Sequence, residues 1–358
     1  MFLSLSARIL ANVEALNMIE SIGNMVRHRK APVVIKQESN EYKIVFVPAI
    51  SGESLAHGYQ ATLAKLASEV GVPVCERCSR EEFIKHSTDE LFTNKDKELF
   101  NEKLDPHEFE KRIIKHCTVE DIGGFLYTGG DYCSDPVKRT SKIQFSYMIP
   151  TYDTIKNVAV ESQFHVRYAP SEPREPAQAI YYVDTGSALY GVMANLELSG
   201  ILKTSMVKIE NVIKEEEKFK EEFKKRVDIA IKALYLTLAS PLFGGHRSRF
   251  NPHWEIESLV VALAKPLVFT VSPPHSKIYI SSTVVKAKDY KELFSDTKLS
   301  DELELKIYYY ISDKSAFKEE ELPKDEEVEG LSIKRITGSV EELFNEVWST
   351  VKNWIEST

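Results

Sequence analysis

The sequence predicts an α+β fold, in which amphipathic helices cover an antiparallel sheet. Segments with alternating apolar residues occur within the first 50 residues and again after residue 158, a period typical of strands. Segments with apolar residues every three or four positions lie between and after them, a period typical of helices. The chain of 358 residues is 43% hydrophobic and 28% charged, so it is long enough to bury a sizeable core.

The first 72 residues predict a strand, a hairpin and a helix, in that order. The alternation over residues 2–16 predicts the strand, and segments 32–37 and 42–50, separated by a turn-forming Ser39-Asn40, predict the hairpin. Apolar residues recur at helical spacing from 51 to 71, with Ser51 as N-cap and Gly71 as the stop.

Residues 73–150 predict a mainly helical insertion, which carries all four cysteines. After it, segments 158–168 and 177–186 flank a proline-rich stretch and predict a protruding β-hairpin at about residues 160–185. The remaining predictions are a strand at 187–200, a helix at 221–241, a strand at 258–265, a solvated acidic loop at 319–329 and a helix that begins with a capping box at 339–342.

Without the insertion and the extensions, the element order is strand, helix, strand, strand, helix, strand. That order is typical of the ferredoxin-like fold, which RNA-recognition-motif (RRM-like) domains also use. The predicted core, or palm, comprises residues 1–72 and 151–358. Fold alone does not give function.

The net charge of -8, from 46 basic and 54 acidic residues, disfavours indiscriminate nucleic-acid binding through bulk charge. The longest run without Asp, Glu, Lys or Arg is the 14 residues 233–246, which is too short to span a bilayer. The first 20 residues contain Arg8 and Glu14 and have no basic leader, unlike a signal peptide. We therefore expect a cytoplasmic protein.

Several loops combine cations with small polar residues that suit phosphate binding. An isolated basic cluster is more often a solvated surface. Ser51 could serve only as the helix N-cap and not bind phosphate, and Glu53 would repel a phosphate. Recurrence in several loops favours a basic, polar track. The candidate residues are Arg27, His28, Arg29, Lys30, Ser51, Gly52, Ser54, Lys138, Arg139, Thr140, Ser141, His165, Arg167, His246, Arg247 and Arg249.

The cysteines give half of a metal-binding pattern. Cys75 and Cys78 have the two-residue gap that chelates zinc, but Cys117 and Cys133 lie far along the chain and form no second CxxC. The histidines that could complete a site are His86, His107 and His116. A metal, a disulfide and plain buried thiols all remain open. We therefore assign no metal site and keep Cys75 and Cys78 only as an open candidate pair.

The sequence shows no recognisable set of catalytic residues. The basic segment has no carboxylate between Glu20 and Glu38, and the glycine-rich residues 121–131 lack the lysine and the spacing of a P-loop. The lone histidines His57, His165, His246 and His253 are possible acid-base groups on RNA. We therefore expect a protein that is not an enzyme and needs no cofactor.

Several stretches together resemble one protein family. They are SARILANVEALNMIESIGNMVRHRKAPVV from residue 6, VPAISGESLAHGYQATLA from 47, GGFLYTGG from 123, VKRTS from 137, YMIP from 147 and ESQFHVRY from 161. They resemble the archaeal type I-A member of the DevR family of CRISPR-associated proteins, the RAMP-like RNA-binding backbone subunit of the Cascade complex. The resemblance runs from residue 3 to about residue 265.

The resemblance implies an RRM-related palm, a helical insertion and a hairpin thumb. It implies copies stacked in a helical filament along one guide RNA (crRNA), which is presented for pairing with target DNA, while other Cascade subunits cap the filament. The residues that would grip the RNA backbone are Asn24, Arg27 to Lys30, Ser51, Gly52, Ser54, His57, the thumb residues His165 and Arg167, and His246, Arg247 and Arg249. Residues 138–141 would face RNA or DNA.

Two departures from the wider family matter. The strand GVMANLELSG lacks paired stacking aromatics, so base readout on the sheet is not expected. Related type III subunits cut RNA with an aspartate in the loop after the first strand, and this loop has no carboxylate. One alternative is a RAMP-type RNA-processing ribonuclease that uses His57, His165 or a metal at the cysteines. Another is a sequence-specific regulator, which the lack of a helix-turn-helix pattern disfavours.

Overall fold

The computed structural model describes residues 1–37, 39–100, 102–169 and 177–357, with the side chains of 167–169 and 177–179 outside that description. The strands are β1 (Phe2–Glu14), β2 (Met18–Ile22), β3 (Met25–His28), β4 (Lys30–Lys36), β5 (Tyr42–Pro48), β6 (Phe125–Tyr127), β7 (Val137–Arg139), β8 (Ile143–Phe145), β9 (Ile149–Pro150), β10 (Ala159–Ala169), β11 (Ala177–Glu197), β12 (His253–Lys265), β13 (Glu304–Ile311), β14 (Glu326–Val328) and β15 (Leu331–Ile336). The α-helices are α1 (Gly52–Val70), α2 (Glu76–Ser79), α3 (Asn94–Leu99), α4 (Pro106–His116), α5 (Thr118–Gly123), α6 (Glu216–Ala239), α7 (Tyr279–Leu293) and α8 (Val340–Glu356).

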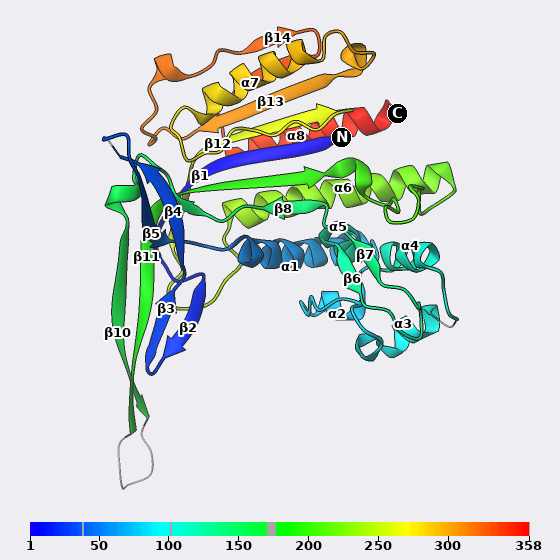
Figure 1. Ribbon diagram of the computed structural model, residues 1–358, viewed down its shortest axis with the longest axis horizontal. Coiled ribbons are helices and arrows are strands. Elements are labelled where there is room, and N and C mark those ends of the chain that lie inside the picture. The colour runs from blue at the N-terminus through cyan, green and yellow to red at the C-terminus, as the bar shows by residue number, and fades with distance from the viewer. Residues whose placement is uncertain (38, 101, 170–176, 358) are drawn as a thin grey trace.

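A large mixed sheet forms the centre of the molecule (Figure 1). Strand β1 lies between β11 and β12 and is antiparallel to both. β13 continues the sheet beyond β12, followed by β15, which is parallel to β13, and the edge strand β14. On the other side, β8 and β9 pair antiparallel with the second half of β11, while β10 pairs with its first half.

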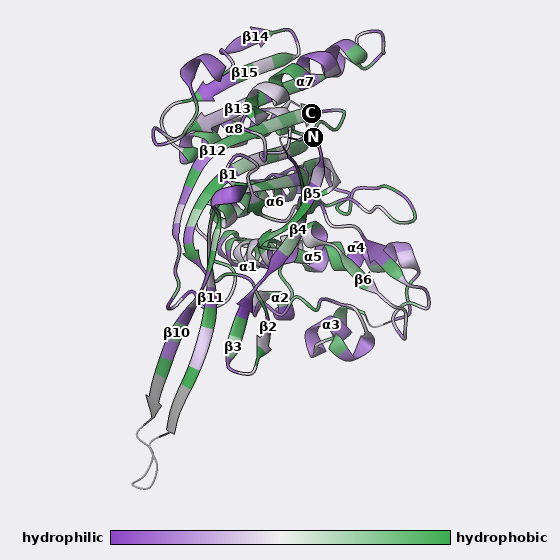
Figure 2. Ribbon diagram, turned by 60° about the vertical axis from the view of Figure 1, so that its left-hand side comes forward, coloured by the Kyte–Doolittle hydropathy of each residue, from purple (hydrophilic) through white to green (hydrophobic). Residues whose placement is uncertain are grey.

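Both faces of the sheet are covered. Alternate residues of β1, from Leu3 to Ala11, enter a core with α1, α6 and α8. On the opposite face, α7 packs over β12, β13 and β15 in a second core. Ser4, Ser6 and Arg8 lie on this second face and are also buried. Figure 2 shows hydrophobic residues along much of β1, β11 and β12, as a sheet buried on two faces requires.

The hairpin of β10 and β11 extends from the sheet as a long protrusion (Figure 1). Its strands pair without a break from Ala159 opposite Ser187 to Ala169 opposite Ala177. β11 is 21 residues long, and the separate strands predicted at 177–186 and 187–200 are its two halves. The strand continues through Gly186 because its pairing with β10 is unbroken there, although the register with β1 shifts between Ala11 and Glu14.

Residues 73–142 form a small unit beside α1, where α2 to α5 surround the short pair β6 and β7 (Figure 1). Its own core is mainly aromatic and contains Phe92, Phe100, Phe109 and Tyr127. The segment predicted as insertion ended at residue 150, but β8 and β9 belong to the central sheet. Short strands at 143–150 have too few residues to show a period in the sequence.

Most predicted elements are present with shifted ends. The predicted helix at 51–71 is α1, with Ser51 as N-cap and Gly71 in the left-handed region at φ 72°, and the C-terminal helix is α8, capped by Ser339. The acidic segment was predicted to be a loop, but residues 326–328 form β14. We did not predict α7, β13 or β15. Among the described residues, no helix combines the length and the apolar composition needed to cross a bilayer.

Candidate nucleic-acid interface

A cavity of about 560 Å³ opens where three distant segments meet. Arg29 lines it from the junction of β3 and β4, and Ser51, Ser54 and His57 line it from the start of α1. The loop after α6 closes it with residues 242–247, which include His246 and Arg247. The fold therefore brings six of the predicted residues, from three of the predicted segments, into one basic groove.

Asn17, between β1 and β2, holds two sides of the basic groove together. Its side-chain oxygen accepts a hydrogen bond from the backbone N–H of Ser51 at 2.9 Å, and its carbonyl oxygen accepts one from the N–H of Arg29 at 3.0 Å. The Ser51 hydroxyl accepts from the N–H of Ser54 at 3.2 Å. This is the N-cap role, so Ser51 shapes the helix start through its side chain.

Two glycines allow close backbone approach at the groove. Gly244 has φ 82°, and a Cβ atom there would lie 2.3 Å from the carbonyl oxygen of Leu16. The neighbouring Gly245 donates its N–H to the same oxygen at 3.0 Å, which fixes the loop against the end of β1. A Cβ atom at Gly52 would lie 2.6 Å from the Phe145 carbonyl oxygen of β8, so Gly52 is needed for packing.

The charges in the basic groove are mixed. The Nε of Arg29 is buried and has no hydrogen-bond partner among the residues that the structure describes. Glu81 also lines the groove, but it is paired with Lys65 at 3.0 Å. Glu53 lines the groove and is exposed, so the repulsion expected from the sequence remains there and Arg29 and Arg247 oppose it.

The base of the hairpin protrusion contacts the same loop. His165 stacks on Tyr181 with ring centroids 5.1 Å apart and meets Phe250 edge-on at 5.3 Å. Arg249 donates a hydrogen bond to the Tyr181 hydroxyl. These contacts place His165 and Arg249 beside the loop that closes the basic groove. Arg167 pairs through its backbone with Ala179 in the hairpin, and its side chain lies outside the described residues.

Residues 27–30, expected in a loop, form the end of β3 and the start of β4. Asn24 lies in the turn between β2 and β3, and its carbonyl oxygen accepts from the N–H of Tyr182 at 2.8 Å. Arg27 and Lys30 are exposed, and Arg27 lies 3.8 Å from Glu20. Neither of these cations lines the basic groove.

His28 is a correction to the predicted interface, because its side chain is buried. Its Nε2 lies 2.5 Å from a carboxylate oxygen of Glu14, which also accepts from the Tyr190 hydroxyl at 2.8 Å. Burial lowers the pKa of His28, but the hydrogen bond and charge of Glu14 outweigh it and raise the pKa overall. The sequence has no acid between 20 and 38, yet the fold brings Glu14 and Asp184 to this segment.

Arg139 is a second correction. It is buried and forms ion pairs with Glu110 at 3.2 Å and with Asp121, which in turn binds Arg226 of α6 at 2.9 Å. Lys138 and Thr140 are exposed, and the Ser141 hydroxyl donates to the carbonyl oxygen of Ile143 at 2.6 Å. None of residues 138–141 lines the basic groove.

Comparison with known proteins agrees with the resemblance found in the motifs. A family model described as "CRISPR-associated negative auto-regulator DevR/Csa2" matches residues 5–284. The chain belongs to the DevR/Csa2 family. It is 42% identical over 283 residues to the CRISPR-associated aCascade subunit Cas7/Csa2 2 of Saccharolobus solfataricus, covering 78% of this chain and 85% of that protein.

Another DevR/Csa2 relative from the same organism, CRISPR-associated protein Cas7/Csa2 1, is 38% identical over 270 residues, which cover 74% of this chain and 80% of that one. A solved structure described as a CRISPR RNA-guided surveillance complex, pre-nicking, superposes with a TM-score of 0.50 over 98% of this chain and 99% of its own. Its sequence is 11% identical, so this likeness concerns the fold alone.

In this member of the DevR/Csa2 family, three of the four cysteines converge. Cys75, Cys78 and Cys117 lie together with Glu120, whereas Cys133 lies in the aromatic core of the 73–142 unit. The sequence argument that Cys117 is too far along the chain is wrong, because α4 carries it back beside α2. His107 pairs with Glu210 and His116 with Asp96, each at 2.8 Å.

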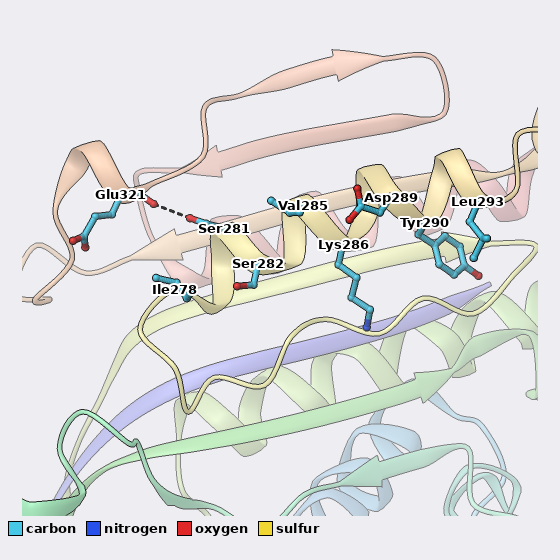
Figure 3. Close-up of a pocket in the computed structure, with 9 residues that line it drawn as sticks. All are labelled: Ile278, Ser281, Ser282, Val285, Lys286, Asp289, Tyr290, Leu293 and Glu321. Carbon is cyan, nitrogen blue, oxygen red and sulfur yellow. Dashed lines mark hydrogen bonds between the residues drawn. The ribbon is translucent and has the colours of Figure 1, made fainter. Parts of the chain in front are cut away.

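A larger cavity, of about 720 Å³, lies on the exposed side of α7 and is mainly apolar (Figure 3). Its single cation, Lys286, points away from the helix and donates to the carbonyl oxygen of Thr270 at 2.6 Å. Ser281 donates to the carbonyl oxygen of Glu321 at 2.7 Å. Lys286 and Ser281 are thus bonded within the chain and the lining is mainly apolar, so the basic groove remains the better candidate for a polar ligand despite its smaller volume.

Sequence reasoning missed the residues that assemble the site. Asn17 and Tyr181 were not singled out, although each joins segments that the sequence had identified separately. A polar Asn17 at the end of an apolar strand pattern is a signal that was available. Tyr181 gave none, because tyrosine is common in half-buried strands.

Proposed function

We propose that this protein is a non-catalytic backbone subunit of a Cascade-type surveillance complex and binds guide RNA through the basic groove. The single observation that carries the proposal is the convergence of Arg29, His57, His246 and Arg247 with the start of α1. Guanidinium groups match phosphate oxygens in two-point geometry, and a helix start favours anions. The aCascade name of the 42% identical relative supports the assembly.

We infer that the core is ferredoxin-like. The strand order β12-β1-β11-β8, antiparallel throughout, and the two helices α1 and α6 on one face support this inference. In this proposal the palm comprises residues 1–72 and 151–358, and the hairpin at about 160–185 is the thumb. Residues 73–142 are the insertion, and the strands β8 and β9 that follow it complete the palm sheet.

The proposed binding mode is independent of base sequence. A subunit that must accept any guide should hold phosphates and sugars, and phosphate contacts carry no sequence information. The groove residues are cations and small polar groups, which suit that task. His165 and Arg249, beside the same loop, extend the proposed contact along the thumb base. The guide would then remain available for pairing with target DNA.

We propose that copies of this chain assemble side by side along the guide, with other Cascade subunits at the ends, in the cytoplasm. The β4–β5 hairpin supports a copy-to-copy contact. Val34, Tyr42, Ile44 and Phe46 lie on one side of it and are more than half exposed. An exposed apolar patch of this kind on a small hairpin marks an interaction surface.

The RNA-binding proposal is tested by a salt titration of binding to an RNA of arbitrary sequence. In the double variant Arg29→Ala with Arg247→Ala, we expect at least a tenfold loss of affinity and a salt slope smaller by about 0.7 for each lost phosphate contact. Arg335→Ala is the matched control, because Arg335 lies on β15 and pairs with Glu319. Its affinity should equal that of the wild type.

An unchanged affinity and slope in the double variant would refute the groove assignment. The ribonuclease alternative is tested in the same samples by following RNA length on a gel. RNA cleavage by the wild type that disappears in His57→Ala or His165→Ala would show that the protein is an enzyme. Intact RNA in all samples, with binding retained, is the expected result.

A further inference from the structure

Four potential metal ligands meet inside the unit formed by residues 73–142. They are the thiols of Cys75, Cys78 and Cys117 and the carboxylate of Glu120, and their ligand atoms all lie within 4.8 Å of one another. All four side chains are buried, and the three cysteines are free thiols. Burying so many ionisable groups at one point is costly unless a partner compensates their charge.

The chain positions these ligands from two separate segments. Cys75 is the N-cap of α2 and Cys78 lies within the helix, and their two sulfur atoms lie within 4.8 Å of each other. Cys117 lies between α4 and α5, and Glu120 follows in the first turn of α5. The N–H of Thr118 donates to the carbonyl oxygen of Pro73 at 2.8 Å, which fixes the two segments beside each other.

We propose that Cys75, Cys78, Cys117 and Glu120 form a structural, tetrahedral zinc site. Thiolate ligands select zinc among the common divalent metals, and structural zinc sites use four protein ligands. Zinc-sulfur bonds of about 2.3 Å in tetrahedral geometry separate the sulfurs by about 3.8 Å, which the observed cluster allows. With four protein ligands in a buried position, the site has no open place for a substrate.

The groups around Glu120 hold its carboxylate in one orientation, as a zinc ligand requires. His86 lies with Nδ1 2.6 Å from one carboxylate oxygen of Glu120, and its backbone N–H donates to the other at 3.2 Å. On its far side, Nε2 of His86 lies 3.2 Å from Asp96, which also pairs with His116. Such outer partners orient carboxylate ligands in metal sites.

The local charge also suits a thiolate-rich zinc site. Three thiolates and one carboxylate exceed the charge of Zn²⁺ by two negative charges, so further cations are needed nearby. Lys85 supplies one: its ammonium donates to the carbonyl oxygens of Gly123 and Gly124 at 2.9 and 2.6 Å and interacts electrostatically with Glu120, Cys78 and Cys117. His86 is placed to supply a second.

The zinc site would hold the 73–142 unit on the palm. It joins α2 to α5, and the residue after Glu120 is Asp121, which binds Arg139 of β7 and Arg226 of α6. Metal loss should therefore loosen the unit as a whole. The basic groove contacts this unit through Glu81, which lines it, and through His57, whose ring centroid lies 5.0 Å from that of Phe83. Arg29 and Arg247 lie outside the unit, so the RNA-binding test on these two arginines addresses the proposed function separately from the metal.

The experiment measures zinc in the purified full chain by mass spectrometry after extensive dialysis. We expect about one zinc per chain in the wild type and in Cys133→Ser, whose cysteine is buried outside the cluster. In Cys78→Ser and Cys117→Ser we expect loss of the metal and a lower melting temperature. Zinc retained in both cluster variants would place it elsewhere and overturn the proposal.

A second measurement needs no folded variant. The wild-type chain produced with cobalt in place of zinc should show the intense visible absorption and thiolate charge-transfer bands of tetrahedral Co²⁺ bound to sulfur. Thiol titration after unfolding in chelator should find all four cysteines reduced. Absence of metal with four reactive thiols, or a disulfide within the cluster, would overturn the proposal while leaving the RNA-binding test unaffected.

Discussion

At the residue scale, the arginines of this protein differ in whether a buried carboxylate neutralises their charge. Arg29 keeps a buried Nε without a partner in the described part of the chain and lines a groove, whereas Arg139 has the same chemistry and is consumed by two buried acids. Desolvated charges without partners are costly, so an unpartnered guanidinium at a groove is an informative observation. The imidazoles differ in the same way. His28 is paired with Glu14, whereas the Nε2 of the buried His275 has no hydrogen-bond partner among the described residues.

His275 predicts a loss of stability in mild acid. Burial, with the nearby positive charge of Arg8, lowers its pKa from 6.5 to about 4. The unfolded chain takes up the proton first as the pH falls, so stability decreases between about pH 6.5 and pH 4, by about 3 kcal/mol. Urea unfolding across this range should show a smaller decrease in His275→Asn than in the wild type. Equal decreases in both would contradict the prediction.

At the element scale, the interface depends on how strands and helices end. α1 begins at the groove because Ser51 caps it, and β1 ends where Leu16 and Asn17 bind the two other sides. The loop after α6 reaches Leu16 only because Gly244 has no side chain. The site is therefore built mainly from backbone contacts at element ends.

Gly244→Ala should disturb the groove, and Gly245→Ala should not. A Cβ atom at 244 would lie 2.3 Å from the Leu16 carbonyl oxygen, in a left-handed residue at φ 82°, whereas one at 245 would meet nothing within 4 Å. We expect Gly244→Ala to lose at least about 1–2 kcal/mol of stability. RNA affinity should fall with it. Thermal unfolding and a binding titration of the two variants would check this, and equal behaviour would refute it.

The buried network of Arg139, Asp121 and Arg226 predicts a large effect from a small change. Asp121→Asn keeps the side-chain shape but leaves two buried guanidinium groups without their shared carboxylate. We expect a loss of about 3–5 kcal/mol in unfolding free energy. The control is Asp228→Asn, which removes a surface pair with Lys232 and should cost at most about 1 kcal/mol. Similar losses in the two would argue against the network.

At the scale of the whole molecule, the apolar side of the β4–β5 hairpin and the protruding thumb lie away from the two hydrophobic cores (Figure 1). A single chain gains nothing from exposing Phe46 and Tyr42, which are 71% and 74% exposed. Burial of such residues between copies would contribute about 25 cal/mol per Å² of apolar area. This gives assembly a physical driving force beyond RNA binding.

Assembly should therefore weaken when the hairpin is made polar. In the double variant Ile44→Asp with Phe46→Asp, we expect one copy to bind a short RNA normally. Binding of further copies to a longer RNA should be at least about tenfold weaker, or about 1.4 kcal/mol. Sedimentation on RNAs of two lengths measures both. Ile209→Asp removes a similarly exposed residue outside the hairpin and should assemble as the wild type does. Unchanged assembly of the double variant would exclude this surface.

The sequence alone determined the strongly periodic elements and the family. β1, the β4–β5 hairpin, α1, α6 and α8 follow from local patterns and caps, because those features depend on residues a few positions apart. The motif resemblance likewise needed no coordinates. Loop residues such as His246 and Arg247 were predicted as RNA-binding residues from their side-chain type.

Only the tertiary structure decided which candidates share a site. His28 is buried and paired with Glu14, and Arg139 is buried and paired with Asp121, in contacts between residues that are not neighbours in the sequence. Cys117 reaches Cys75 and Cys78 because α4 turns the chain back. Contacts between elements that are distant in the sequence leave no periodic pattern in it. The sequence therefore shows which functional groups exist, and the packing decides which of them remain available for a ligand.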